Sequence, residues 1–185
     1  MRSSDASDTN RETWSGSVLT AHQRATLDAM LARLVPTDEH GPGAREAGVL
    51  RYIERALASE YREDRDRYAD GLREVDEHAS KHFGLGFCDL APEEQDAALS
   101  MIEKLPRSGS GLDSGGFFEL VRGHALEGMF GDPVWSGNID QVGWDLLGYP
   151  GVREEWTERD QRLDAPVRRV VRRSEDGPQT DRRAD

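Results

Sequence analysis

The stretch FFELVRGHALEGMFGDPVWSGNIDQVGWDLLGYPG, residues 117–151, places large aromatic side chains on backbone that must turn repeatedly. It holds six of the chain's aromatic residues, which comprise five Phe, four Trp and four Tyr, together with several glycines and two prolines. Glycine and proline favour sharp turns, whereas large rings favour burial or a protein interface. Because neither a plain loop nor a plain core helix has this mixture, we expect the functional centre here.

The sequence that precedes this stretch has the apolar spacing of amphipathic helices. Thr20 and Gln23 have the spacing of a capping box, and Pro36 ends the helix that they begin. Further helices are predicted at 44–59, 64–83, from 92 onward, 116–130 and, shorter, at 140–147. No stretch alternates for long like a β-strand. The sequence therefore predicts an all-α compact bundle of about five helices, followed by an irregular aromatic and Gly-rich segment.

Two helix boundaries in the middle of the chain carry their own signals. Gly84 and Gly86 end the helix over 64–83, and Pro92 stands at a first helical position. The apolar side of the helix that starts at Pro92 is expected to hold Ala98, Ile102 and Leu105.

Composition limits the classes of function. The chain has 36 acidic and 24 basic residues and a net charge of −12, which disfavours non-specific binding of nucleic acid. No segment approaches the 18 or so apolar residues that a membrane-spanning helix needs. A single cysteine, Cys88, excludes an internal disulfide.

The sequence divides into one domain and two tails. Residues 1–17 are polar and are expected to be disordered, residues 18–156 form the helical domain, and residues 157–185 form a charged flexible tail. The first residues contain neither an apolar signal-peptide core nor a twin-arginine pair. As written, the chain is expected to be cytoplasmic.

Two groups of residues are candidates for catalysis or metal binding. Glu74, His78 and His82 are spaced by four on one predicted helix and could present three metal ligands, but a solvated charged face is the favoured interpretation. His124 lies three residues before Glu127 and could act as a general base that this carboxylate orients. A hydrogen-bonded histidine in a core or an interface is favoured over the general base.

Cofactor motifs are missing from the sequence. It has no phosphate-binding glycine loop after a strand, no G-x-S-x-G elbow and no C-x-x-C-H haem motif. We therefore expect no catalytic residue, no bound metal and no bound cofactor in this chain. A helical metal-binding enzyme that uses the Glu74 group, and a stand-alone interaction protein, remain as alternatives.

The order of the motifs resembles the gluconate 2-dehydrogenase subunit 3 family, over about residues 19–151. The first specific part is PTDEHGPGA, residues 36–44, and the second is the Phe117-Phe118 pair. The remaining parts follow in order: Glu127-Gly128, Asp132-Pro133, Gly137-Asn138, Gly143-Trp144 and Gly148-Tyr149-Pro150-Gly151.

The resemblance implies a non-catalytic small subunit. In this family the flavin, FAD, belongs to a large partner of the glucose-methanol-choline type, and a cytochrome c subunit often receives the electrons. The small subunit supports folding of the large one and often carries its export signal. This chain departs from that pattern by its missing twin-arginine signal. The complex is then cytoplasmic, or periplasmic or membrane-associated if it is exported with the partner.

We expect the partner interface in residues 117–151, because Trp and Tyr are the usual anchors of interfaces. The alternative is a small core packed onto the helices, and the two are compatible. The expected interface residues are Phe117, Phe118, His124, Trp135, Asn138, Trp144 and Tyr149.

Overall fold

The computed structural model describes residues 18–105, 114–151, 157–158 and 161–163. This part of the chain contains six α-helices and no strand, so the predicted all-α fold is confirmed. The α-helices are α1 (Ala21–Leu34), α2 (Val49–Ala58), α3 (Arg65–Phe83), α4 (Pro92–Glu103), α5 (Ser114–Phe130) and α6 (Val142–Leu146). Short 3₁₀ turns are η1 (Arg62–Asp64), η2 (Phe87–Asp89), η3 (Pro133–Trp135) and η4 (Ile139–Gln141).

Some predictions fall outside the described residues. They are the disordered tail over 1–17 and most of the flexible tail over 157–185. Within the described residues, no helix combines the length and the apolar character that crossing a bilayer requires.

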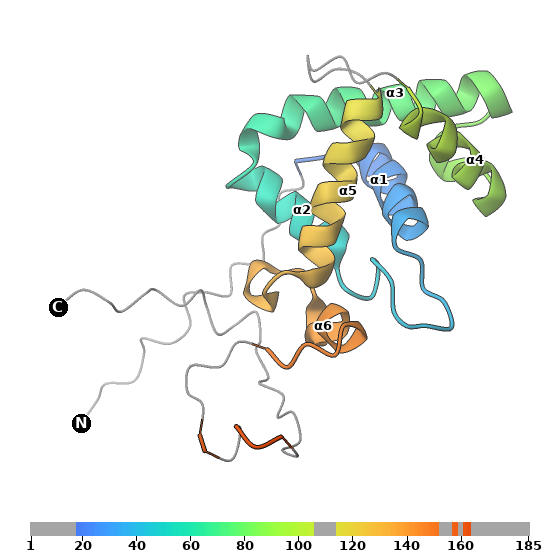
Figure 1. The fold of residues 1–185 in the computed structure, drawn as a ribbon. Coiled ribbons are helices and arrows are strands. Elements are labelled where there is room, and N and C mark those ends of the chain that lie inside the picture. Colours follow the sequence, from blue (N-terminus) through green and yellow to red (C-terminus); the bar gives the residue numbers. More distant parts are fainter. Residues whose placement is uncertain (1–17, 106–113, 152–156, 159–160, 164–185) are drawn as a thin grey trace, which may run out of the picture.

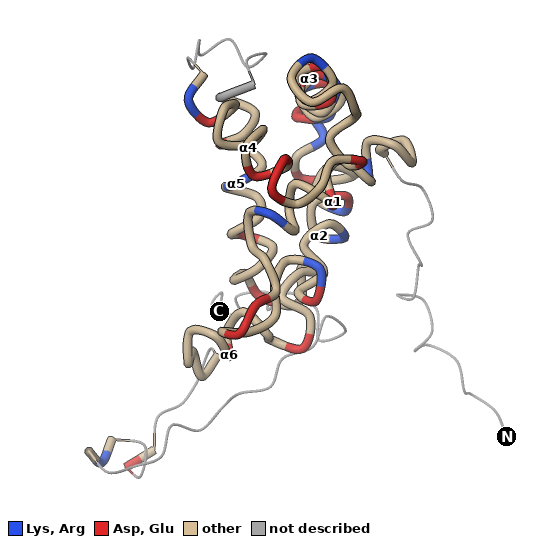
Figure 2. The backbone as a smooth tube through the Cα atoms, turned by 90° about the vertical axis from the view of Figure 1, so that its right-hand side faces the viewer, with Lys and Arg blue, Asp and Glu red and all other residues tan. Residues whose placement is uncertain are grey.

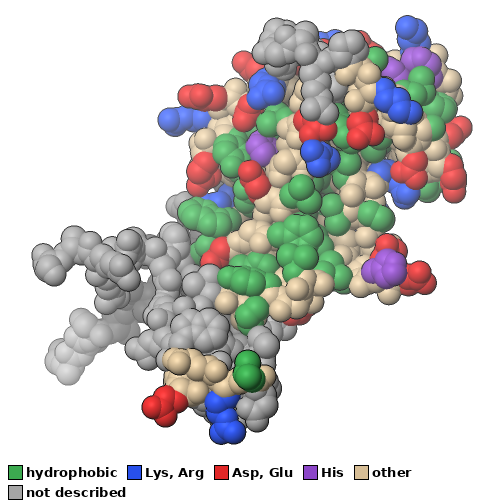
Figure 3. Space-filling model, in the orientation of Figure 1, with side chains coloured by type: hydrophobic (Ala, Val, Ile, Leu, Met, Phe, Trp, Pro, Cys, Tyr) green, Lys and Arg blue, Asp and Glu red, His purple; other side chains and the backbone are tan. Residues whose placement is uncertain are grey.

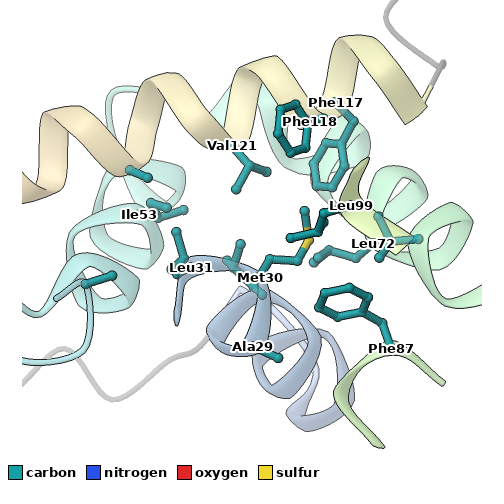
Figure 4. Packing of buried hydrophobic residues seen from close by; sticks show 14 of the residues in the cluster. Ala29, Met30, Leu31, Ile53, Leu72, Phe87, Leu99, Phe117, Phe118 and Val121 are labelled. Atoms are coloured by element: carbon teal, nitrogen blue, oxygen red, sulfur yellow. The ribbon is translucent and has the colours of Figure 1, made fainter. Parts of the chain in front are cut away.

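Helix α5 lies at the centre of the fold. It packs against α1, α2, α3, α4 and α6, and Figure 1 shows α6 at its lower end. Phe117, Phe118 and Val121 extend from α5 into the core, where they meet Met30 of α1 and Leu72 of α3 (Figure 4). The core thus joins the first four helices through one face of the fifth.

Helix α1 begins and ends where its sequence predicts. The Thr20 hydroxyl accepts a hydrogen bond from the Gln23 amide at 3.2 Å, and the Gln23 side chain accepts one from the Thr20 amide at 2.9 Å. This capping box satisfies two amides that have no partner inside the helix. At the other end Val35 leaves helical geometry with φ −134° and ψ 80°, directly before Pro36. Helical spacing predicts that Leu27, Met30, Leu31 and Leu34 face inward; the first three are buried, and Leu34 is half-buried.

Helix α2 begins five residues later than predicted, at Val49 instead of Ala44. Ala44 instead donates its amide to the Val35 carbonyl at 2.9 Å, which ties the turn back to the end of α1. Gly48 then takes the left-handed conformation, with φ 70° and ψ 31°, and starts the helix in a new direction. A sequence pattern of helical periodicity cannot show this reset, because the apolar spacing continues across it.

The end of α4 also differs from the expectation. Ala98 and Ile102 are buried as predicted, but Leu105 is exposed. The helix ends at Glu103, so the periodicity that would place Leu105 inward no longer applies two residues later.

Asp76 on α3 connects three elements. Its carboxylate accepts hydrogen bonds from the Phe87 amide of η2 at 2.9 Å and from the Thr26 hydroxyl of α1 at 3.2 Å. It also pairs with His22 Nε2 of α1 at 2.7 Å. This single carboxylate therefore fixes how α1, α3 and η2 sit together.

We predict that Asp76→Ala lowers the free energy of unfolding by about 3 kcal/mol, because hydrogen bonds to a charged group are lost and the Phe87 amide loses its acceptor. Urea titration followed by circular dichroism measures this change. The control is Glu77→Ala on the same helix, which removes only an exposed pair with Arg73 and should cost less than about 1 kcal/mol. Equal effects of the two variants would contradict the role of Asp76.

Candidate functional site

The segment that follows α5, residues 131–151, folds back onto the end of that helix, and we call it the end segment. It consists of η3, η4 and α6, and α6 packs against α5. The Ile139 amide also donates to the Ala47 carbonyl at 3.1 Å, which joins the end segment to the turn before α2. The aromatic and Gly-rich stretch is therefore a structured cap and not an open loop.

Asn138 is the residue that fastens the end segment to α5. Its backbone amide donates to the Gly128 carbonyl at 2.7 Å, and its side-chain Nδ2 donates to the Gly131 carbonyl at 2.9 Å. Its Oδ1 accepts a hydrogen bond from the Gly143 amide at 2.8 Å. The residue is fully buried, and its backbone has a left-handed φ of 44°. Asparagine suits this position because it tolerates that conformation and offers both a donor and an acceptor.

Two glycines allow the end segment to approach α5 closely. A Cβ atom on Gly137 would clash with the Gly128 carbonyl, and one on Gly143 would clash with the Met129 carbonyl. Several other residues of the segment also turn through positive φ; they are Ser136, Asp140 and Gln141. The backbone here is thus committed to contacts that larger residues would prevent.

Trp144 belongs to the end segment and is buried. Its indole Nε1 donates to the Phe130 carbonyl of α5 at 2.7 Å. Tyr149 crosses it edge-on, with 5.0 Å between ring centroids, and returns a backbone amide to the Trp144 carbonyl at 2.8 Å. Trp144 therefore connects α5 to the exposed end of the segment.

Trp135 lies on the surface at the same end of the molecule, next to α2. The guanidinium of Arg55 sits 4.9 Å from the centre of its ring, and Arg55 also bonds to Glu60. This stacking holds the indole while leaving 38% of the residue exposed.

An exposed apolar cluster begins at the last residue of α6, and we call it the α6 patch. It consists of Leu146, Leu147 and Tyr149, and Leu147 is 64% exposed. Figure 3 shows apolar side chains gathered over α5 and continuing toward α6, with charged side chains mostly at the margins. Large apolar side chains on rigid backbone are typical of protein interfaces.

The structure divides the residues predicted for the partner interface into two sets. Trp135 and Tyr149 are exposed. The buried residues are Phe117, Phe118, His124, Asn138 and Trp144. These five side chains support the surface from below and do not themselves form it, so the interface hypothesis narrows to the exposed set and the α6 patch.

Sequence reasoning missed Leu146 and Leu147. They continue the apolar run of a predicted short helix, and such a run indicates burial. Helical spacing could have found Leu146, which lies about 200° around the helix from Trp144. Leu147 follows the last residue of α6, so its exposure has no such signal.

His124 sits in a polar cluster in the interior. Its Nδ1 shares a hydrogen bond of 2.9 Å with the Tyr68 hydroxyl, and its ring stacks on Tyr61 with 4.5 Å between centroids. The tyrosines of this cluster come from α2, from the residue before η1 and from α3, and the sequence did not indicate that they meet His124. Glu127 accepts hydrogen bonds from the hydroxyls of Tyr52 at 2.9 Å and Tyr61 at 3.1 Å.

Burial sets the protonation of this cluster. It raises the pKa of Tyr52, Tyr61 and Tyr68, with Glu127 raising the first two further. It also lowers the pKa of the buried His124, against the opposing effect of nearby Glu127. At neutral pH the phenols stay protonated and His124 stays neutral, so the cluster is a structural brace between α2, α3 and α5.

The candidate metal ligands on α3 are Glu74, His78 and His82. The rings of His78 and His82 stack with 4.2 Å between centroids, and His82 Nδ1 bonds to the His78 carbonyl at 2.8 Å. Among the described residues, no group of three or more His, Cys, Asp or Glu side chains could hold a metal ion. Burial and the neighbouring His82 lower the pKa of His78.

The described part of the chain is thus an all-α domain with one distinctive surface, the capped end of α5. Comparison with protein-family models is more specific, because the model for gluconate 2-dehydrogenase subunit 3 matches residues 21–151. The chain belongs to that family, which is named for a subunit of a gluconate 2-dehydrogenase complex. Searches of curated proteins and of solved structures found no match.

We predict that Gly143→Ala destabilises the protein by about 1–3 kcal/mol, because the new methyl group must displace the end segment from the Met129 carbonyl. Urea unfolding monitored by tryptophan fluorescence measures this. The matched control is Gly123→Ala on α5, where the methyl group meets open space and should stabilise by up to about 1 kcal/mol. Effects of the same sign at both positions would contradict the close approach.

A second prediction concerns acid stability. Because burial holds the pKa of His124 below 6.5 in the folded chain, the unfolded chain binds more protons below about pH 6.5. The free energy of unfolding therefore decreases as the pH falls through that region. His124→Phe keeps a stacking ring without the titrating group and should make the decrease shallower.

Urea titrations at a series of pH values measure the slope. The control is His40→Phe, at a side chain that is 82% exposed in the folded chain and should leave the slope of the wild-type protein unchanged. An unchanged slope in His124→Phe would show that other groups cause the acid sensitivity.

Proposed function

We propose that this chain is a non-catalytic small subunit that binds and stabilises the FAD-containing catalytic subunit of a gluconate or sugar dehydrogenase complex. In this proposal the flavin and the oxidation chemistry belong to the partner. The family to which the chain belongs supports a place in a dehydrogenase complex. In this proposal the two subunits share one cellular compartment, and either subunit can carry the signal that directs them there.

The exposed α6 patch is the observation that carries the proposal. Leu147 and Tyr149 are exposed beside a cap that α5 holds through Asn138 and Trp144. Because the backbone is already ordered, little conformational entropy is lost when a partner covers these side chains. Covering a fully exposed leucine contributes about 1.5–3 kcal/mol, so these partly exposed side chains can supply a part of the binding free energy of a larger contact.

Leu147→Glu tests the site directly. A tagged full-length chain is purified from its own host, and the co-purifying FAD and its protein are quantified by fluorescence and peptide mass spectrometry. The wild-type chain should bring down one flavoprotein dehydrogenase with its FAD. Leu147→Glu should reduce that yield at least about tenfold, which corresponds to about 1.4 kcal/mol of binding free energy.

Leu85→Glu is the matched control for this test. Leu85 is 52% exposed and lies between α3 and η2, away from α6 (Figure 1). It receives the same change in size and charge and should leave the yield unchanged. Failure of the wild-type chain to bring down a flavoprotein would refute the function, whereas equal yields of both variants would refute only the site.

A further inference from the structure

The segments around the α6 patch carry charges of one sign. The end segment contains Asp132, Asp140 and Asp145 but no lysine or arginine. The loop between α1 and α2 contributes Asp38 and Glu39 and has no basic side chain other than His40 from residue 35 to residue 44. Figure 2 shows both signs on the helices of the bundle and only acidic positions along the end segment.

The loop and the α6 patch form one continuous surface. Gly41 lies directly against the Leu146 side chain, so closely that a Cβ atom there would clash with it. Asp38 and Gly41 exchange backbone hydrogen bonds of 3.1 and 3.2 Å, which fixes the loop tip. Glu39 is 89% exposed at that tip. Its carboxylate therefore stands in solvent close to the apolar patch.

Two arginines of the described residues near this end of the molecule are paired with acidic side chains. Arg45, which lies in the same loop, bonds to Asp28 of α1 at 2.8 Å. Arg55, which covers Trp135, bonds to Glu60 at 3.5 Å. Neither arginine pairs with Asp38 or Glu39, and His40 Nε2 lies 3.9 Å from the Glu39 carboxylate. The described segments around the patch therefore carry more acidic than basic side chains.

We call the acidic residues of the end segment and of the loop tip the acidic rim. We propose that the α6 patch and this rim bind a basic surface of the catalytic subunit, in which Arg or Lys side chains surround an apolar pocket. This inference rests on the proposed function. Complementary charge at the rim accelerates encounter and selects the partner, while the buried apolar centre supplies most of the affinity. A second copy of this chain would bring a like-charged rim to the same place, which disfavours self-association there.

Charge reversal at the loop tip tests the proposal. The Asp38→Lys/Glu39→Lys variant of the full chain is mixed with the purified flavoprotein subunit, and the association rate is measured by stopped flow at several salt concentrations. At low salt we expect the rate to be about tenfold lower than that of the wild-type chain. The difference should shrink toward molar salt, where the Debye length falls to about 3 Å.

Glu93→Lys/Glu103→Lys on α4 is the control, because it makes the same change of net charge at exposed positions away from α6 (Figure 1). This control should associate at a rate within about twofold of the wild-type rate. Equal slowing by both variants would mean that only net charge matters and would overturn the proposal, as would a salt-independent rate.

The outcome is separable from that of the proposed function. If Leu147→Glu abolishes co-purification but the loop-tip variant associates normally, the subunit assignment stands and the acidic rim has no role. Sedimentation of the wild-type chain alone provides a further outcome. A dimer at low salt that Leu147→Glu dissolves would show that a second copy covers the patch, and the proposal would fail.

Discussion

The carbonyl groups in the last turn of α5 cannot be satisfied within the helix, and the end segment supplies their partners. The Gly128 and Gly131 carbonyls accept hydrogen bonds from Asn138, and the Phe130 carbonyl accepts one from Trp144. Many helices end with a short turn, often at glycine, that satisfies such groups locally, and the Gly131 amide bonds to the Glu127 carbonyl at 2.8 Å in this way. Here α5 ends against about twenty residues of irregular chain, so the shape of that chain is set by the positions of the α5 carbonyls.

This capping also explains why the end of α5 is coupled to the rest of the bundle. Gly128 lets the Tyr52 ring approach the helix closely, and Tyr52 donates its hydroxyl to Glu127 one residue earlier. On the other side, Ile139 bonds to Ala47 in the turn before α2. The end segment, the Tyr52–Glu127 contact and the turn before α2 therefore form one connected region.

Sequence periodicity predicted the helices well, because each buries one apolar stripe against α5. It failed where the backbone departs from regular geometry. Gly48 interrupts a pattern that reads as continuous helix, and the end of α4 leaves Leu105 exposed. The partner interface stays a prediction, and five of the seven residues that the sequence suggested for it are buried. Trp144 resembles a surface anchor in the sequence, yet its indole donor finds the Phe130 carbonyl inside. That pairing depends on the fold of residues 131–143 and has no local sequence signal.

The separation of supporting and exposed residues decides how this surface can be studied. Asn138 and Trp144 hold the cap through hydrogen bonds to α5, so changing either one alters stability and the surface together. Leu147 is mostly exposed, so a polar residue there changes the surface while the bonds that hold the cap remain. Loss of binding in a Trp144 variant could follow from loss of the cap alone. Loss in a Leu147 variant that unfolds like the wild-type chain requires that a partner covers the patch, and this distinction follows from burial alone.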